Sequence, residues 1–173
     1  MRETLEAIHQ LRADGVISAY AIGGAVGATF YVEPMATMDI GVFVSFQGAP
    51  DDLLIDLSPL YGWAEAHGFE TRGEYIVLGG WPVQFLPPSD ALDQEALARA
   101  VETEVEGVKA RVMTAEHLVA IALRVGRAKD CARILQFIEA AALDAAVLED
   151  ILARHGLARK WAEFGRRFLE GQP

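Results

Sequence analysis

The stretch "AIGGAVGATFYVEPMATMDIGVFV", residues 21–44, carries residue types that suit phosphate chemistry. It reads as a strand, a turn at Gly23 and Gly24, a helix, and a second strand that carries Asp39. Glycines in a strand-to-helix turn let the backbone approach a phosphate closely, and the amide groups at the start of the helix then meet the anion. An aspartate on the neighbouring strand is a ligand that suits Mg²⁺.

Phosphoryl and nucleotidyl transfer depend mainly on positioning and on compensation of negative charge by Mg²⁺. Two carboxylates at positions i and i+2 of a strand point to the same side and can share a metal pair. A third carboxylate on an adjacent strand can activate the attacking hydroxyl group. In this chain the residue two positions after Asp39 is Gly41, so the pattern is incomplete.

Residues 23–44 resemble the nucleotidyltransferase fold of the DNA polymerase β superfamily, and most closely its minimal AbiEii-like bacterial branch. That branch, found in toxin–antitoxin and phage-defence systems, carries Gly-Gly-x-Ala followed by Arg-x-Thr-x-Asp-h-Asp, where h is hydrophobic. The resemblance assigns Gly23 and Gly24 to the glycine turn, and Thr37 and Asp39 to the threonine and the first metal-binding aspartate. It implies a nucleoside triphosphate as ligand and Mg²⁺ as cofactor.

A later segment, "VKARVMTAEHLVAIALRVGRAKD", resembles the part of the family in which a helix leads to Arg-x-Lys-Asp. By that resemblance Arg127, Lys129 and Asp130 face the nucleotide, with Lys129 and Asp130 also as candidate catalytic residues beside Asp39. The two matches together cover most of residues 20–160.

Three positions depart from the family pattern. Met35 stands at the arginine, Gly41 at the second metal-binding aspartate, and Gln84, on the strand "PVQFLP", at the third carboxylate. A glutamine side chain is neutral and cannot accept a proton at neutral pH. A lone aspartate leaves most of the hydration shell of Mg²⁺ in place, so the sequence predicts weak Mg²⁺ binding at best.

Three interpretations arise from these departures. The first is a nucleotidyltransferase-fold protein with a degenerate metal centre that still binds a nucleotide or a partner in its cleft. The second is a working Mg²⁺-dependent nucleotidyltransferase with relocated ligands, for which Glu33, Glu74 and Asp130 are the candidate carboxylates, and in which Asp39 pairs with Asp130 or Glu74. The third is a non-enzymatic scaffold or antitoxin-like regulator that acts through a partner protein or as a homodimer.

Charge is distributed unevenly along the 173 residues. Residues 1–108 carry 4 Lys/Arg and 17 Asp/Glu, whereas residues 109–173 carry 11 and 8, which gives −13 and +3 and adds to the net charge of −10. Nucleic-acid binding is not indicated by so acidic a chain. Solvated helix faces are the favoured explanation of this uneven charge, and the alternative is an anion site where the two parts meet.

Composition limits the class of protein. No apolar run approaches the roughly 20 residues that a membrane-spanning helix needs, and the N-terminus lacks the apolar segment of a signal peptide. A single cysteine, Cys131, forms no internal disulfide and is expected to be a buried thiol, and these features together predict a cytoplasmic protein. The four histidines show no metal-ligand spacing, so zinc is not expected.

Hydrophobic periodicity predicts the order α-β-α-β-α-β-β-β-α-β, followed by four helices. The fold class is therefore α/β, of the α+β type: a mixed sheet flanked by helices with a C-terminal helical region. Residues 1–113 form the expected α/β core, and residues 114–173 the helical region packed against it. Residues 49–68 are expected to be mostly helical with a break or kink at Pro59, and the helix that begins at Ser89 is expected to run through "VETEV".

Overall fold

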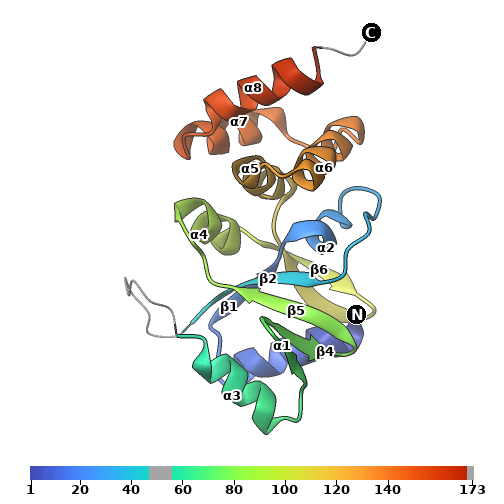
Figure 1. The fold of residues 1–173 in the computed structure, drawn as a ribbon, viewed down its shortest axis with the longest axis vertical. Helices are drawn as coiled ribbons and strands as arrows, with labels where there is room; N and C mark the ends of the chain where they lie inside the picture. Colours follow the sequence, from blue (N-terminus) through green and yellow to red (C-terminus); the bar gives the residue numbers. More distant parts are fainter. Residues whose placement is uncertain (47–55, 171–173) are drawn as a thin grey trace.

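The computed structural model describes residues 1–46 and 56–170 (Figure 1). A seven-stranded mixed sheet has the strand order β3-β4-β5-β2-β1-β7-β6. The strands are β1 (Ala19–Ile22), β2 (Ile40–Ser45), β3 (Thr71–Arg72), β4 (Tyr75–Leu78), β5 (Trp81–Leu86), β6 (Val101–Val105) and β7 (Val108–Val112). In the middle of the sheet β1 runs antiparallel to β2 and parallel to β7, while β2 runs parallel to β5.

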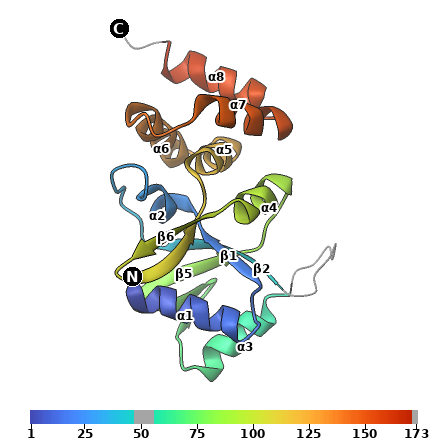
Figure 2. The same ribbon diagram turned by 180° about the vertical axis from the view of Figure 1, so that it is seen from behind.

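Helices cover both faces of this sheet (Figures 1 and 2). They are α1 (Arg2–Ala13), α2 (Gly24–Ala28), α3 (Ser58–Ala66), α4 (Ala91–Ala98), α5 (Ala115–Val125), α6 (Ala128–Glu139), α7 (Ala145–Arg154) and α8 (Ala158–Phe168). Helices α1 and α3 lie on one face, whereas α2, α4 and then α5–α8 lie on the other. The α/β class with a mixed sheet and flanking helices is confirmed.

Each face of the sheet has its own hydrophobic core, because successive side chains of a strand point to opposite faces. In β1, Tyr20 and Ile22 pack into the core beneath α1 and α3. Ala21 packs into the second core, which also contains Leu118 of α5 and Phe137 of α6. The C-terminal helices therefore share a core with the sheet. Cys131 packs against this second core and is only partly buried, so the expectation of a buried thiol is met only in part.

The expected extension of the fourth helix through "VETEV" is wrong. Helix α4 ends at Ala98, and Val101–Val105 forms β6, an antiparallel hairpin with β7. Glu106 and Gly107 connect the two strands with φ of 53° and 80°, as in a type I′ turn. The alternating β-branched residues favour the strand, and pairing with β7 outweighs the helix propensity of the glutamates.

The expected helix over residues 49–68 is confirmed only in its second half. Residues 47–55 lie outside the described residues, and α3 begins at Ser58. Pro59 neither breaks nor kinks the helix, because it lies in the first turn, where a helix needs no N–H from it. Among the helices that the structure describes, none is long and apolar enough to cross a membrane.

Glu95 of α4 links the sheet to the C-terminal helices. Its carboxylate accepts hydrogen bonds from Arg154 Nη2 at 2.8 Å and His155 Nε2 at 2.7 Å, at the end of α7. Buried His117 of α5 has its Nε2 atom 3.6 Å from the same carboxylate. The Glu95 carboxylate thus contacts residues of both α5 and α7 and links these two helices to α4.

Acid is expected to weaken this link. The hydrogen bond from Arg154 holds the pKa of Glu95 well below its usual value. Because the folded-state pKa lies below the unfolded-state pKa of about 4.3, the stabilisation is complete above that pH and is lost as pH falls toward the folded-state pKa. Glu95→Gln should lower the free energy of unfolding at pH 7 and flatten its decline between about pH 5 and 3.

Urea denaturation over a pH series measures this effect. Glu163→Gln, which removes an exposed ion pair with Arg159 on α8, is the matched control and should leave the pH profile nearly unchanged. If Glu95→Gln and the natural chain lose stability in parallel as the pH falls, Glu95 does not provide the acid-sensitive link.

Candidate functional site

The glycine turn predicted from the sequence joins β1 to α2. Gly23 precedes the first helical residue, and its N–H donates to the carbonyl oxygen of Gly41 at 2.9 Å. A Cβ atom at Gly23 would lie 2.9 Å from a ring carbon of Phe43, closer than carbon atoms approach in proteins. Gly24 has a φ of 61°, in the left-handed region that favours glycine. The predicted strand, turn and helix are confirmed here.

Asp39, Gly41 and Gln84 come together at one edge of the sheet. Asp39 precedes β2, and Gly41 lies two residues further on the same face. Gly41 and Gln84 are directly paired across the parallel strands β2 and β5. The three positions line one cavity, with Asp39 as the only carboxylate among them.

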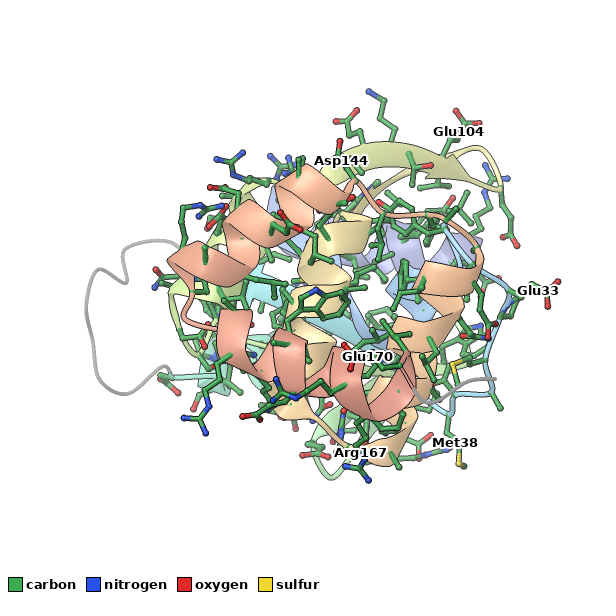
Figure 3. All side chains as sticks on the ribbon, turned by 90° about the horizontal axis from the view of Figure 1, so that it is seen from above. Glu33, Met38, Glu104, Asp144, Arg167 and Glu170 are labelled. Carbon is green, nitrogen blue, oxygen red and sulfur yellow. The ribbon has the colours of Figure 1, made fainter. Side chains whose placement is uncertain are left out.

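Thr37 supports Asp39 from the preceding loop. The Thr37 hydroxyl lies 3.2 Å from Asp39 Oδ1 and 3.1 Å from the Asp39 carbonyl oxygen, so it can donate to either. Thr37 and Asp39 line the cavity. Met38 between them points outward and is 88% exposed (Figure 3). The Thr37-x-Asp39 spacing therefore places both polar side chains on the cavity side.

The start of α6 forms the opposite wall. Arg127, Lys129 and Asp130 all line the cavity. Asp130 is 1% exposed, and its Oδ2 atom accepts from Arg127 Nε at 2.7 Å and from the Arg127 N–H at 3.2 Å. The hydrogen bond to Asp130 raises the pKa of Arg127, and the charge of Asp39 adds to this effect. The side chain of Lys129 makes no hydrogen bond or ion pair with the described residues.

Sequence reasoning missed Arg133, one turn after Lys129 on the same helix. Arg133 is 8% exposed and lines the cavity. Its only polar contact among the described residues joins Nη1 to Asp130 Oδ1 at 3.4 Å, and its Nε has no partner there. Burial lowers the pKa of this guanidinium. The signal in the sequence was the spacing of four residues from Lys129, which places both cations on one helix face.

A second missed group joins α4 to α5. Asp93 is 2% exposed, and its carboxylate accepts from Arg124 Nη2 at 2.8 Å and from Ser89 Oγ at 2.6 Å. Arg124 also contacts Asp90, the N-cap residue of α4. Asp93, Ser89 and Arg124 line the cavity. Asp90 and Asp93 read as ordinary helix-start residues, so only the fold reveals their contact with α5.

These walls enclose a cavity of about 330 Å³ between the sheet edge and helices α5 and α6. Its apolar surface includes Phe43, Leu86 and Ile121, and its charged surface comes from three carboxylates and four cations. The carboxylates are Asp39, Asp93 and Asp130, and the cations are Arg124, Arg127, Lys129 and Arg133. Its volume and mixed lining match those of small-molecule sites in proteins.

Comparison with solved structures relates this architecture to known folds. A crystal structure of an antigenic nucleotidyltransferase-like protein from Paracoccidioides brasiliensis superposes over 93% of this chain and 89% of its own, with a TM-score of 0.53 and 13% sequence identity. The chain has a nucleotidyltransferase-like fold. At this level of identity the similarity establishes the fold and nothing further.

Other comparisons are weaker. The solution structure of the antibiotic-resistance factor ANT(2'')-Ia covers 94% of this chain and 96% of its own, at 16% identity and a TM-score of 0.49. Its crystal structure in complex with adenylyl-2''-tobramycin gives 16% identity and a TM-score of 0.43 over 95% and 98% of the two chains. No protein-family model matches the sequence, and neither does any curated protein.

Within this nucleotidyltransferase-like fold, the side chains at the sheet edge do not fit a two-metal centre. Asp39 is the one carboxylate on the strand side of the cavity, because Gly41 and Gln84 occupy the neighbouring positions. Across residues 1–46 and 56–170, no group of three His, Cys, Asp or Glu side chains is placed to hold a metal ion. The side chains that line this cavity therefore do not support a bound pair of Mg²⁺ ions.

The candidate replacement carboxylates lie in different surroundings. Glu33 is exposed at the outer edge of the molecule (Figure 3), and Glu74 is exposed beside β4. Neither lines the cavity. Asp130 does line it, but the guanidinium groups of Arg127 and Arg133 engage both of its oxygens.

Proposed function

We propose that the cavity binds the phosphate groups of a nucleotide and that the protein does not transfer nucleotidyl groups efficiently. The observation that carries this proposal is the cavity itself, in which Gly41 and Gln84 stand beside Asp39 while four cations line the helical wall. The resemblance to AbiEii-like nucleotidyltransferases points to the same ligand class.

Charge pairing decides which cations are available to an anion. Arg124 is engaged by Asp90 and Asp93, and Arg127 by Asp130. Lys129 makes no ion pair with a described residue, and Arg133 shares Asp130 through one long contact. Lys129 and Arg133 are therefore the groups that a phosphate would satisfy, and charge-assisted hydrogen bonds to phosphate are strong.

Asp39 has a different effect in this proposal from its role in an active enzyme. Without a second carboxylate it holds Mg²⁺ poorly, and its negative charge then repels the phosphates that Lys129 attracts. ATP binding should therefore need no Mg²⁺, and Asp39→Asn should bind ATP as tightly as the natural chain or more tightly.

Isothermal titration with ATP, GTP, CTP and UTP, with and without Mg²⁺, tests the proposal. Lys129→Gln should weaken binding of the preferred nucleotide about tenfold, as expected for loss of one charge-assisted contact. Arg166→Gln, which removes an exposed cation on α8 away from the cavity lining, is the matched control and should leave binding unchanged.

Two results would contradict the proposal. One is the absence of saturable binding by any of the four nucleotides. The other is turnover of labelled nucleotide onto protein or RNA that Asp39→Ala abolishes, which would instead support a working nucleotidyltransferase with relocated carboxylates.

A further inference from the structure

A second cavity of about 370 Å³ lies between the C-terminal half of α1 and the strands β1, β6 and β7. It shares no lining residue with the nucleotide cavity. Figure 2 shows α1 on the face of the sheet opposite to α5 and α6. The polar side chains that line this second cavity are His9, Arg12, Tyr20, Glu102, Lys109 and Arg111.

Positive charge gathers here against the local composition. Residues 1–112 contain only six Lys/Arg beside 17 Asp/Glu, yet Arg12 meets Lys109 and Arg111 in this one cavity. Carboxylates are abundant enough in this part of the chain to pair with every cation. A group of three cations with a single carboxylate in the lining is therefore not explained by composition.

Ion pairing singles out two of these cations. Four of the six Lys/Arg residues up to position 111 have a carboxylate oxygen within 4.0 Å, and they are Arg2, Arg72, Arg99 and Lys109. Arg12 and Arg111 have no such partner among the described residues, and both line the second cavity. Lys109 pairs with Glu102 at 3.3 Å. Because this ion pair cancels the charges of Lys109 and Glu102, the net charge of the lining comes from the two guanidinium groups of Arg12 and Arg111.

The lining also contains a buried hydrogen-bond donor that has no partner among the described residues. Arg111 donates from Nη2 to the carbonyl oxygen of Ala100 at 3.0 Å, while its buried Nε has no partner among the described residues. Tyr20 is 1% exposed, and its hydroxyl group lies 3.0 Å from His9 Nε2. Burial raises the pKa of Tyr20, and the nearby Arg111 and Arg12 act in the opposite direction. Tyr20, Arg12 and Arg111 line the same cavity.

We propose that this second cavity binds a phosphate dianion, either free or as the phosphate group of a small ester. Two guanidinium groups match its charge, and their planar forks match the geometry of its oxygens. The phosphate would satisfy Arg12 and Arg111, while Lys109 stays paired with Glu102. This site is independent of the nucleotide cavity.

Titration of the full chain with inorganic phosphate, followed by the ¹H–¹⁵N signals of the arginine Nε groups, tests the proposal. The signals of Arg12 and Arg111 should shift saturably, with chloride at equal ionic strength as the reference. Arg12→Gln should weaken phosphate binding about tenfold. Arg2→Gln removes an exposed arginine of the same helix that is already paired with Glu6, and should change affinity less than twofold.

Glycerol 3-phosphate forms the second arm of the experiment. Tighter binding of this ester assigns the site to a phosphomonoester, and tighter binding of inorganic phosphate assigns it to the free ion. Shifts confined to Arg124, Arg127 and Arg133 would place the phosphate in the nucleotide cavity and overturn the proposal. Equal effects of Arg12→Gln and Arg2→Gln would also overturn it.

Discussion

The double variant Gly41→Asp with Gln84→Asp is expected to bind Mg²⁺ at least about tenfold more tightly than the natural chain does. The register of β2 and β5 pairs positions 41 and 84 directly, and Asp39 lies two residues before Gly41. Three carboxylates would then share one edge of the sheet. Each added oxygen ligand replaces a water of the metal, and together they supply the charge that the natural site lacks.

The backbone has room for this change. A Cβ atom at Gly41 would meet only Leu86 Cδ1, at 3.7 Å, which is an ordinary van der Waals contact. Gln84 is half-buried and lines the same cavity. In the absence of Mg²⁺ the three carboxylates repel one another, so the double variant should melt at a lower temperature than the natural chain and regain stability when Mg²⁺ is added.

Isothermal titration with MgCl₂ and thermal melts with and without the metal measure both effects. Adding Asp39→Asn to the double variant should return Mg²⁺ affinity toward that of the natural chain, because one of the three carboxylate ligands would be removed. A folded double variant that binds Mg²⁺ no more tightly than the natural chain would show that the missing side chains are not what limits the site.

Asp93→Ala is expected to destabilise the fold by about 3 kcal/mol, since removing one partner of a buried ion pair leaves the other uncompensated. Asp93 is 2% exposed and joins Ser89 to Arg124, so its loss removes a buried polar link between α4 and α5. In this variant Arg124, which is 26% exposed, still forms its ion pair with Asp90. The expected loss of stability is therefore at the lower end of the range for broken buried ion pairs.

Urea denaturation measures this loss. Gln94→Ala, at the next and exposed position of α4, is the matched control and should cost less than about 0.5 kcal/mol. A double-mutant cycle with Arg124→Gln should give a coupling energy of about 1–3 kcal/mol. A coupling energy near zero would show that Asp93 stabilises the protein through Ser89 alone.

Local sequence signals were sufficient for the elements that flank the glycine turn and for the strand that follows Asp39. The Gly23-Gly24 pair after an apolar run predicted β1, the turn and α2, because the left-handed φ of Gly24 is a local demand that glycine meets. Strand β6 was missed although it alternates, because its pairing with β7 outweighs the helix propensity of its glutamates.

The sequence by itself determined which chemistry the sheet edge lacks, since Gly41 and Gln84 carry no carboxylate in any fold. Only the tertiary structure decided that the two positions are neighbours, because the register of β2 and β5 joins segments about 40 residues apart. The same holds for Arg133 and Asp93, whose burial comes from contacts between separate helices. The charge and type of each residue are properties of the chain, whereas the burial of a charged side chain and the pairing of two strands arise only when distant segments pack together.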